Sequence, residues 1–134
     1  MRLVLDASAA VRITLRGERT DVLLEALEPA AVVAAPALFV SEAANALWKY
    51  HRAGILSLDE ALAHHADAVG LVDDFAPDDQ LATEALAEAS RRDHPVYDLL
   101  YAVLARRLGA AVLTLDTRLA GLPGAMGVPV AVQQ

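Results

Sequence analysis

The chain has 134 residues, the length of one domain; 56% of its residues are hydrophobic and only 4% are aromatic, so alanine, leucine and valine must build the core. This composition excludes a disordered chain, and the lack of cysteine excludes a disulfide scaffold, thiol catalysis and thiolate metal sites. The net charge of −7 argues, taken alone, against a protein that binds nucleic acid. No apolar run reaches the roughly 18 residues of a membrane span and no secretory pattern is present, so we expect one soluble, cytoplasmic domain over residues 1–134.

Apolar runs and helical repeats alternate through residues 1–71. Each expected strand is a short, continuously apolar run, and each expected helix repeats its apolar positions every three or four residues. Ser57 and Glu60 have the spacing of a capping box, which starts a helix. The predicted elements are a strand over 3–5, helices over 7–15 and 20–27, a strand over 31–35, a helix over 37–53, and a helix that follows residue 57 and ends near 71.

The same alternation continues to the end of the chain. Pro77 and Pro95 each suit the first position of a helix. The predicted elements are an edge strand over 72–75, helices over 77–92 and 95–109, a strand over 111–115, a turn over 121–127 and a last strand over 128–132. Because the strands are continuously apolar, we expect a three-layer α/β/α fold with a central, mostly parallel sheet of four or five short strands.

Two acids directly follow predicted strands. Asp6 ends the strand over 3–5, and Asp116 ends the strand over 111–115. In an open parallel sheet, ligands bind beyond the carboxyl ends of the strands, so the two carboxylates converge if these strands are neighbours. The alternative is that each aspartate only caps the helix after it, since aspartate is a favoured N-cap residue.

Two further acids occupy apolar helix faces. Asp98 shares its face with Tyr101 and Ala102, although an acid in the first turn of a helix also complements the helix dipole. Glu42 lies among alanines and is seven residues from Lys49, too far for the usual pairing with a residue four positions away. A carboxylate on a packed face is costly unless it is paired, hydrogen-bonded or bound to a cation.

Together these four acids predict a cation site. Two carboxylates about 4 Å apart repel by roughly 4 kcal/mol at an effective dielectric of about 20, so converging acids need a compensating charge. Mg²⁺ prefers carboxylate oxygens and water, and it often completes its shell with a substrate phosphate. The pattern therefore indicates phosphate-ester chemistry, in which one or two divalent ions activate water and stabilise the leaving oxygen.

The motifs around these acids resemble those of a known family. The segments are LVLDASA from Leu3, VSEAANAL from Val40, HPVYDLLYAVLARRLG from His94 and VLTLDTRL from Val112. In combination, and over the whole chain, they are similar to the PIN domain. Within that family they look most like the VapC toxins of bacterial toxin–antitoxin pairs.

The resemblance implies a single PIN-like domain that acts as a Mg²⁺- or Mn²⁺-dependent endoribonuclease with one or two ions. By motif position, the catalytic and metal-binding residues would be Asp6, Glu42, Asp98 and Asp116, with Thr114 and Ser8 as supporting polar groups. The usual family products, a 3′-hydroxyl and a 5′-phosphate, would come from in-line attack by metal-activated water. The family often carries one more acid after the fourth, where this chain has Leu119 and Gly121.

The same resemblance implies the partners. Such toxins act on RNA and inhibit growth, form homodimers through the helices around residues 37–71, and are neutralised by a small VapB-type antitoxin. Two bound divalent ions would change the net charge from −7 to −3, and local basic residues would then contact RNA. Arg12 and Arg118 are the main RNA-contact candidates because they lie near site acids in the chain, and Lys49 and Arg52 form a further basic pair.

The remaining motifs predict no other site. His64 and His65 are adjacent and face different sides of a helix, and the chain lacks the His-Glu-x-x-His spacing of a zinc hydrolase. A non-catalytic module of the same fold, which binds a protein partner and has a degenerate site, is the alternative function. The intact set of four acids favours the nuclease.

Overall fold

The central sheet has four parallel strands in the order β3-β2-β1-β4, in a computed structural model that describes residues 1–131. The strands are β1 (Arg2–Leu5), β2 (Val32–Pro36), β3 (Asp74–Ala76) and β4 (Ala111–Leu113). β1 pairs with both β2 and β4, so Val4 lies beside Ala34 on one side and Val112 on the other. The edge strand predicted over 72–75 is confirmed as β3, which begins two residues later than predicted.

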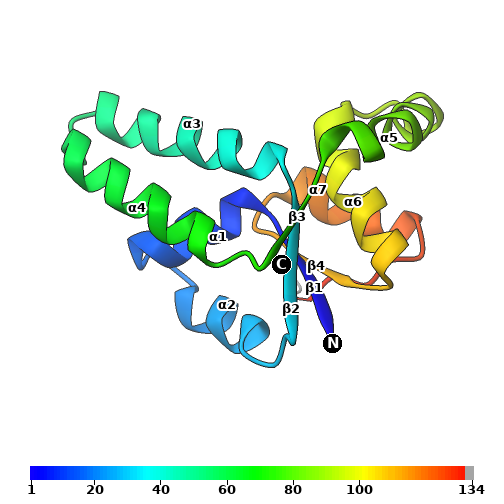
Figure 1. Ribbon diagram of the computed structural model, residues 1–134, viewed down its shortest axis with the longest axis horizontal. Coiled ribbons are helices and arrows are strands. Elements are labelled where there is room, and N and C mark those ends of the chain that lie inside the picture. The colour runs from blue at the N-terminus through cyan, green and yellow to red at the C-terminus, as the bar shows by residue number, and fades with distance from the viewer. Residues whose placement is uncertain (132–134) are drawn as a thin grey trace.

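Helices cover both faces of this sheet (Figure 1). On one side lie α1 (Ala7–Leu15), α2 (Thr20–Leu27), α3 (Leu38–Arg52) and α4 (Leu58–Gly70), and on the other α5 (Asp78–Arg92), α6 (Val96–Leu108) and α7 (Thr117–Ala125). The three-layer α/β/α prediction is confirmed. Leu3, Val4 and Leu5 are fully buried, which explains why the central strand is a continuous apolar run.

The chain reverses its direction of sheet growth at β1. From β1 it adds β2 and then β3 on one side, and it returns to add β4 on the other side of β1. Helices that leave β1 and β4 therefore diverge and open a crevice at the carboxyl ends of these two strands, where ligands bind in open α/β sheets.

The helix boundaries agree with the prediction to within a few residues. Ser57 and Glu60 form the expected capping box at the start of α4. Pro77 and Pro95 are N-cap residues, one position before the helices that they were expected to begin. The strand predicted over 111–115 ends at Leu113.

Two predictions for the C-terminal segment are wrong. The turn predicted over 121–127 lies largely within α7, whose side chains Leu119, Leu122 and Pro123 are buried. Burial of these apolar residues outweighs the local preference of glycine and proline for turns. The strand predicted over 128–132 is reduced to one parallel bridge between Val112 and Val130, and residue 132 lies outside the described residues.

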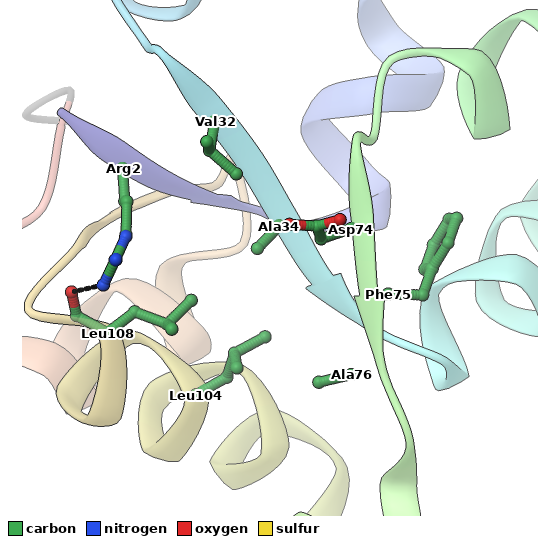
Figure 2. A pocket seen from close by; sticks show the side chains of 8 residues that line it. All are labelled: Arg2, Val32, Ala34, Asp74, Phe75, Ala76, Leu104 and Leu108. Carbon is green, nitrogen blue, oxygen red and sulfur yellow. Dashed lines mark hydrogen bonds between the residues drawn. The ribbon is translucent and has the colours of Figure 1, made fainter.

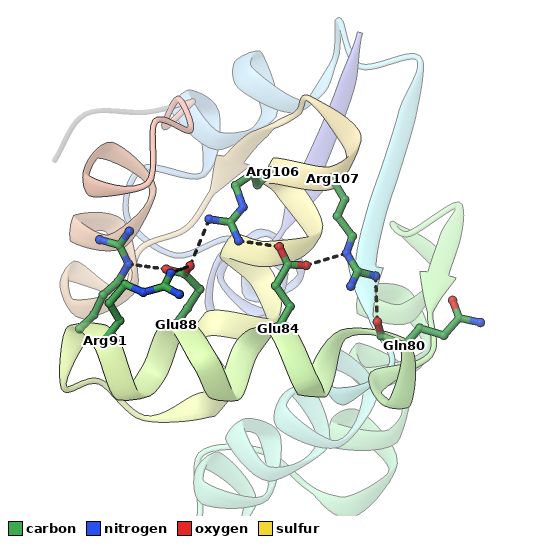
Figure 3. A network of polar contacts seen from close by, with 7 residues as sticks. Gln80, Glu84, Glu88, Arg91, Arg106 and Arg107 are labelled. Carbon is green, nitrogen blue, oxygen red and sulfur yellow. Dashed lines mark hydrogen bonds and ion pairs between the residues drawn. The ribbon is translucent and has the colours of Figure 1, made fainter.

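An ion-pair network fastens α5 to α6 (Figure 3). Glu84 accepts hydrogen bonds from Arg106 at 2.5 Å and from Arg107 at 2.8 Å. Glu88, whose side chain is only 4% exposed, contacts Arg91, Arg92 (2.8 Å) and Arg106 (3.4 Å). These partners hold the pKa of Glu84 and Glu88 below its ordinary value. The network holds the C-terminal end of α6 against α5, whereas the candidate acid Asp98 lies in the first turn of that helix.

Among the described residues, no helix combines the length and the apolar character needed to cross a membrane.

Candidate active site

A cavity of about 300 Å³ lies at the carboxyl ends of β1 and β4 and contains all four acids singled out from the sequence. Asp6 follows β1, Asp116 follows β4, Glu42 projects from α3 and Asp98 from the first turn of α6. The complete lining consists of Asp6, Ala7, Ser8, Glu42, Asn45, Ala46, Lys49, Asp98 and Asp116. Four segments far apart in the chain thus meet at the point where the sheet order reverses.

Asp6 is the most enclosed of the four acids, with 6% of its surface exposed. Its backbone N–H donates to the carbonyl of Leu113 at 3.0 Å, which ties the end of β1 to β4. Its Oδ2 accepts hydrogen bonds from Ser8 Oγ at 2.5 Å and Thr114 Oγ1 at 2.7 Å. The carboxylate does not cap α1, so the alternative interpretation of this residue as a simple helix cap is wrong.

The loop after β4 is bonded to the same cluster of hydroxyl groups. Asp116 donates its backbone N–H to Thr114 Oγ1 at 2.9 Å, and Leu115 donates its own to Ser8 Oγ at 3.3 Å. Ser8 and Thr114 therefore each contact the Asp6 carboxylate and the backbone that carries Asp116. The two predicted supporting groups fix the relative positions of two candidate acids.

Asp116 combines helix capping with a place in the cavity. Its Oδ1 accepts hydrogen bonds from the backbone N–H groups of Arg118 at 2.9 Å and Leu119 at 3.4 Å, which caps α7. The helix-cap interpretation is thus confirmed for this residue. Because both bonds end on Oδ1, Oδ2 is outside the cap and available to a ligand.

Glu42 is held by a tyrosine from a different helix. Tyr101, fully buried on α6, donates its hydroxyl hydrogen to Glu42 Oε1 at 2.6 Å. This bond crosses from the α5–α7 side of the sheet to α3. Sequence reasoning missed it, although a tyrosine three residues after Asp98 on an apolar face was a signal, since buried tyrosines usually find a partner for the hydroxyl.

Asp98 contacts a histidine that precedes its helix. His94 Nε2 lies 2.7 Å from Asp98 Oδ2, and the two side chains are 15% and 19% exposed. His94 was predicted to be a surface or packing residue and not part of the site. Its spacing of four residues from Asp98 was the available signal, because residues four apart are neighbours on a helical turn.

Burial and mutual repulsion perturb the pKa values of the acids. Burial raises the pKa of Asp6, with further increases from the negative charges of Asp116 and Asp98, against the effect of its two hydroxyl donors. Burial likewise raises the pKa of Glu42 to about 7, and the charges of the other three acids add to the rise, against the effect of the tyrosine hydrogen bond. Carboxylates with raised pKa values in one cavity are typical of functional sites.

The donor set suits a hard divalent cation. Four carboxylates that repel one another share one cavity, and carboxylate oxygens are the ligands that Mg²⁺ prefers. Across residues 1–131, no three histidine, aspartate or glutamate side chains are gathered closely enough to hold an ion as they stand. Each of the four acids instead has one oxygen engaged by a protein hydrogen-bond partner.

The two predicted RNA-contact residues do not line this cavity. Arg12 lines a separate hollow at the end of α1, where it donates to the carbonyl of Glu18 at 3.3 Å. Arg118 is exposed, two residues after Asp116. Lys49 is the one basic residue in the lining of the acidic cavity.

A second cavity, of about 310 Å³, lies between α6 and strands β2 and β3 (Figure 2). Its lining consists of Arg2, Val32, Ala34, Asp74, Phe75, Ala76, Leu104 and Leu108. Arg2 donates to the carbonyl of Leu108 at 3.4 Å, at the end of α6. With one acid and mostly apolar walls, this cavity lacks the converging polar groups of the first.

Comparison with known proteins identifies relatives over most of the chain. Residues 3–125 match the PIN domain. The chain is 35% identical over 126 residues to Ribonuclease VapC3 of Pyrobaculum aerophilum. The aligned region covers 90% of this chain and 93% of that protein. The crystal structure of PAE2754 from Pyrobaculum aerophilum superposes with a TM-score of 0.70 at 27% identity, over 90% of this chain and 78% of the other.

Proposed function

The chain belongs to the PIN-domain family, and we propose that it is a VapC-type endoribonuclease that uses one or two Mg²⁺ or Mn²⁺ ions. The observation that carries this proposal is the meeting of Asp6, Glu42, Asp98 and Asp116 in one cavity at the reversal point of the sheet. The relationship to a protein named as a ribonuclease supports RNA as the substrate. We assign the whole of residues 1–134 to this one domain.

Asp6, Asp98 and Asp116, with Glu42, would hold the cation. When bound, such an ion lowers the pKa of water toward neutrality and stabilises charge on the leaving oxygen of a phosphodiester. Residues of the chain prepare this site. Ser8 and Thr114 hold Asp6 in one orientation, and Tyr101 holds Glu42 so that any proton taken up by that carboxylate sits on Oε2.

Family membership also leads us to propose a homodimer, a VapB-type antitoxin and a cytoplasmic location. Helices α3 and α4, with the loop between them, support an interaction surface there, because this part of the chain exposes several large apolar side chains. These are Trp48, Ile55, Leu58 and Leu62, each about half exposed or more. Exposed apolar patches of this kind commonly mark protein contacts.

Cleavage of RNA with and without metal tests the proposal. We expect the purified protein to cut RNA in Mg²⁺ or Mn²⁺, to lose this activity in chelator, and to lose it by at least about a hundredfold on Asp98→Asn. Mg²⁺ should raise the melting temperature of the wild type but not of Asp98→Asn. Glu25→Gln, which removes an exposed acid outside the cavity, is the matched control and should behave as the wild type.

Expression in cells provides a second test. Growth arrest and RNA cleavage should follow induction of the wild type and disappear with Asp6→Asn. Persistence of both in Asp6→Asn would show that the site is elsewhere. Absence of cleavage by the wild type with any divalent metal would instead support the alternative, a binding module with the PIN fold.

A further inference from the structure

Lys49 is the single lysine of the chain. It lies on α3 in the same helical row as Glu42 and Asn45, and all three line the acidic cavity. With a rise of 1.5 Å per residue, Lys49 is about 10 Å along the helix from Glu42. The lysine therefore belongs to the outer part of the cavity rather than to the cluster of acids.

The amine of Lys49 has no protein partner within residues 1–131. It forms no hydrogen bond there, and no carboxylate oxygen lies within 4.0 Å of it, although four carboxylates share its cavity. By contrast, Arg91, Arg92 and Arg106 are all engaged in ion pairs. An exposed, unpaired cation beside an acidic cavity is available for an anionic ligand.

The charge of the cavity limits what that ligand can be. A nucleic-acid strand that reaches the four acids brings a row of phosphates toward a surface that repels them. The cation held by the acids would offset the charge at the reacting phosphate only. A neighbouring phosphate needs its own positive partner, and lysine is a flexible point charge well suited to phosphate.

We propose that Lys49 and Asn45 form a phosphate subsite that holds the RNA strand at a phosphate next to the one that is cleaved. Lys49 supplies the charge, and the amide of Asn45, exposed between Lys49 and Glu42 along the helix, supplies hydrogen-bond donors. The inference rests on the proposed RNA substrate. It makes Lys49 a substrate-binding residue and not a counter-ion for the acids.

Kinetics of three variants test this subsite with an oligoribonucleotide that the wild type cuts. Lys49→Gln removes the charge and should raise KM about tenfold while kcat changes less than about twofold. The dependence of log KM on log salt concentration should become shallower by about 0.7, the value for loss of one phosphate contact on a single strand. Lys49→Arg should stay within about threefold of the wild-type KM.

Arg2→Gln is the matched control. Arg2 is exposed and begins β1, at the opposite end of that strand from the acidic cavity, which it does not line. Its loss changes the net charge by the same amount as Lys49→Gln. KM and the salt dependence should follow the wild type to within about twofold.

Amine methylation provides a readout that does not depend on cleavage. Because the chain has one lysine, the reagent modifies only Lys49 and the terminal amine of Met1, which mass spectrometry distinguishes. Met1 precedes β1 and thus lies at the opposite end of that strand from the cavity, so it is an internal reference. With Mg²⁺ present, the oligoribonucleotide should slow methylation of Lys49 about tenfold relative to Met1, and inorganic phosphate at equal phosphate concentration should not.

The outcomes separate this inference from the proposed nuclease activity. If the wild type cleaves RNA and Lys49→Gln keeps the wild-type KM and salt dependence, the subsite is overturned and the nuclease stands. A fall in melting temperature and kcat without a rise in KM would make Lys49 a counter-ion and also overturn it. If no cleavage occurs, the nuclease proposal fails, and the methylation experiment then tests the subsite by itself. Protection of Lys49 by RNA but not by inorganic phosphate supports a phosphate subsite for RNA. Equal protection by the two, or protection by neither, overturns it.

Discussion

Glu42→Gln is expected to stabilise the metal-free protein at neutral pH. The pKa of Glu42 is raised from its ordinary value of 4.5 to about 7 by burial and by repulsion from the other acids. The folded protein thus binds this proton more tightly than the unfolded chain does. The stabilisation that the protonated Glu42 gives to the folded protein is complete below about pH 4.5 and is lost as the pH rises through about 7.

The size of the effect follows from the pKa difference. A difference of about 2.5 between the pKa of Glu42 in the folded protein and its ordinary value corresponds to roughly 3 kcal/mol of unfolding free energy. Glu42 is half-buried, so solvent screening reduces this to roughly 1–2 kcal/mol of unfolding free energy. Glutamine imitates the protonated acid, and its carbonyl oxygen can still accept the Tyr101 hydroxyl hydrogen.

Urea unfolding in chelator, at a series of pH values, measures this difference. We expect wild type and Glu42→Gln to have similar stability near about pH 4.5, and the variant to be more stable by roughly 1–2 kcal/mol near about pH 7. Mg²⁺ should then stabilise the wild type more than the variant. Glu25→Gln, an exposed substitution of the same kind, should follow the wild type throughout. A variant that is less stable at neutral pH, or a difference that does not change with pH, would refute the electrostatic reasoning.

Three further substitutions test the contacts around the site. Tyr101→Phe removes the 2.6 Å hydrogen bond to Glu42, so kcat for RNA cleavage should fall about tenfold and the apparent pKa of the pH–rate profile should rise, because that bond lowers the pKa of the acid. His94→Ala removes the 2.7 Å contact to Asp98; kcat should fall roughly 10- to 100-fold, with the helical circular-dichroism signal unchanged. Glu88→Gln should lower the melting temperature near about pH 7 and lower it less near about pH 3, because the stabilisation from a lowered carboxyl pKa is complete above the unfolded pKa and is lost as the pH falls through the folded pKa. An equal fall at both pH values would contradict the ion-pair explanation.

The strands and the four acids were predictable because their signals are local. A continuous apolar run gives a buried strand, and Asp6 and Asp116 follow such runs directly. Asp98 and Glu42 stood out because each interrupts an apolar helix face. These patterns can be recognised without knowledge of how distant segments pack.

The contacts that orient the acids depend on packing between distant segments, so the sequence alone did not predict them. Tyr101 reaches Glu42 only because α6 and α3 approach each other across the carboxyl end of the sheet. The C-terminal half of α7 was missed because Gly121 and Pro123 favour a turn locally, whereas burial of the apolar side chains favours the helix. Tertiary interactions decided both cases.

The position of β4 beside β1 also determines when the site can exist during synthesis. The N–H of Asp6 donates to the carbonyl of Leu113, and the Asp6 carboxylate is oriented by Thr114. Asp6 therefore reaches its final position only after these much later residues have been synthesised. A nascent polypeptide that ends before β4 lacks the two contacts that orient Asp6. Under the proposed function, such a truncated product would leave the RNA around it uncut, and cleavage would begin only after β4 has joined the sheet.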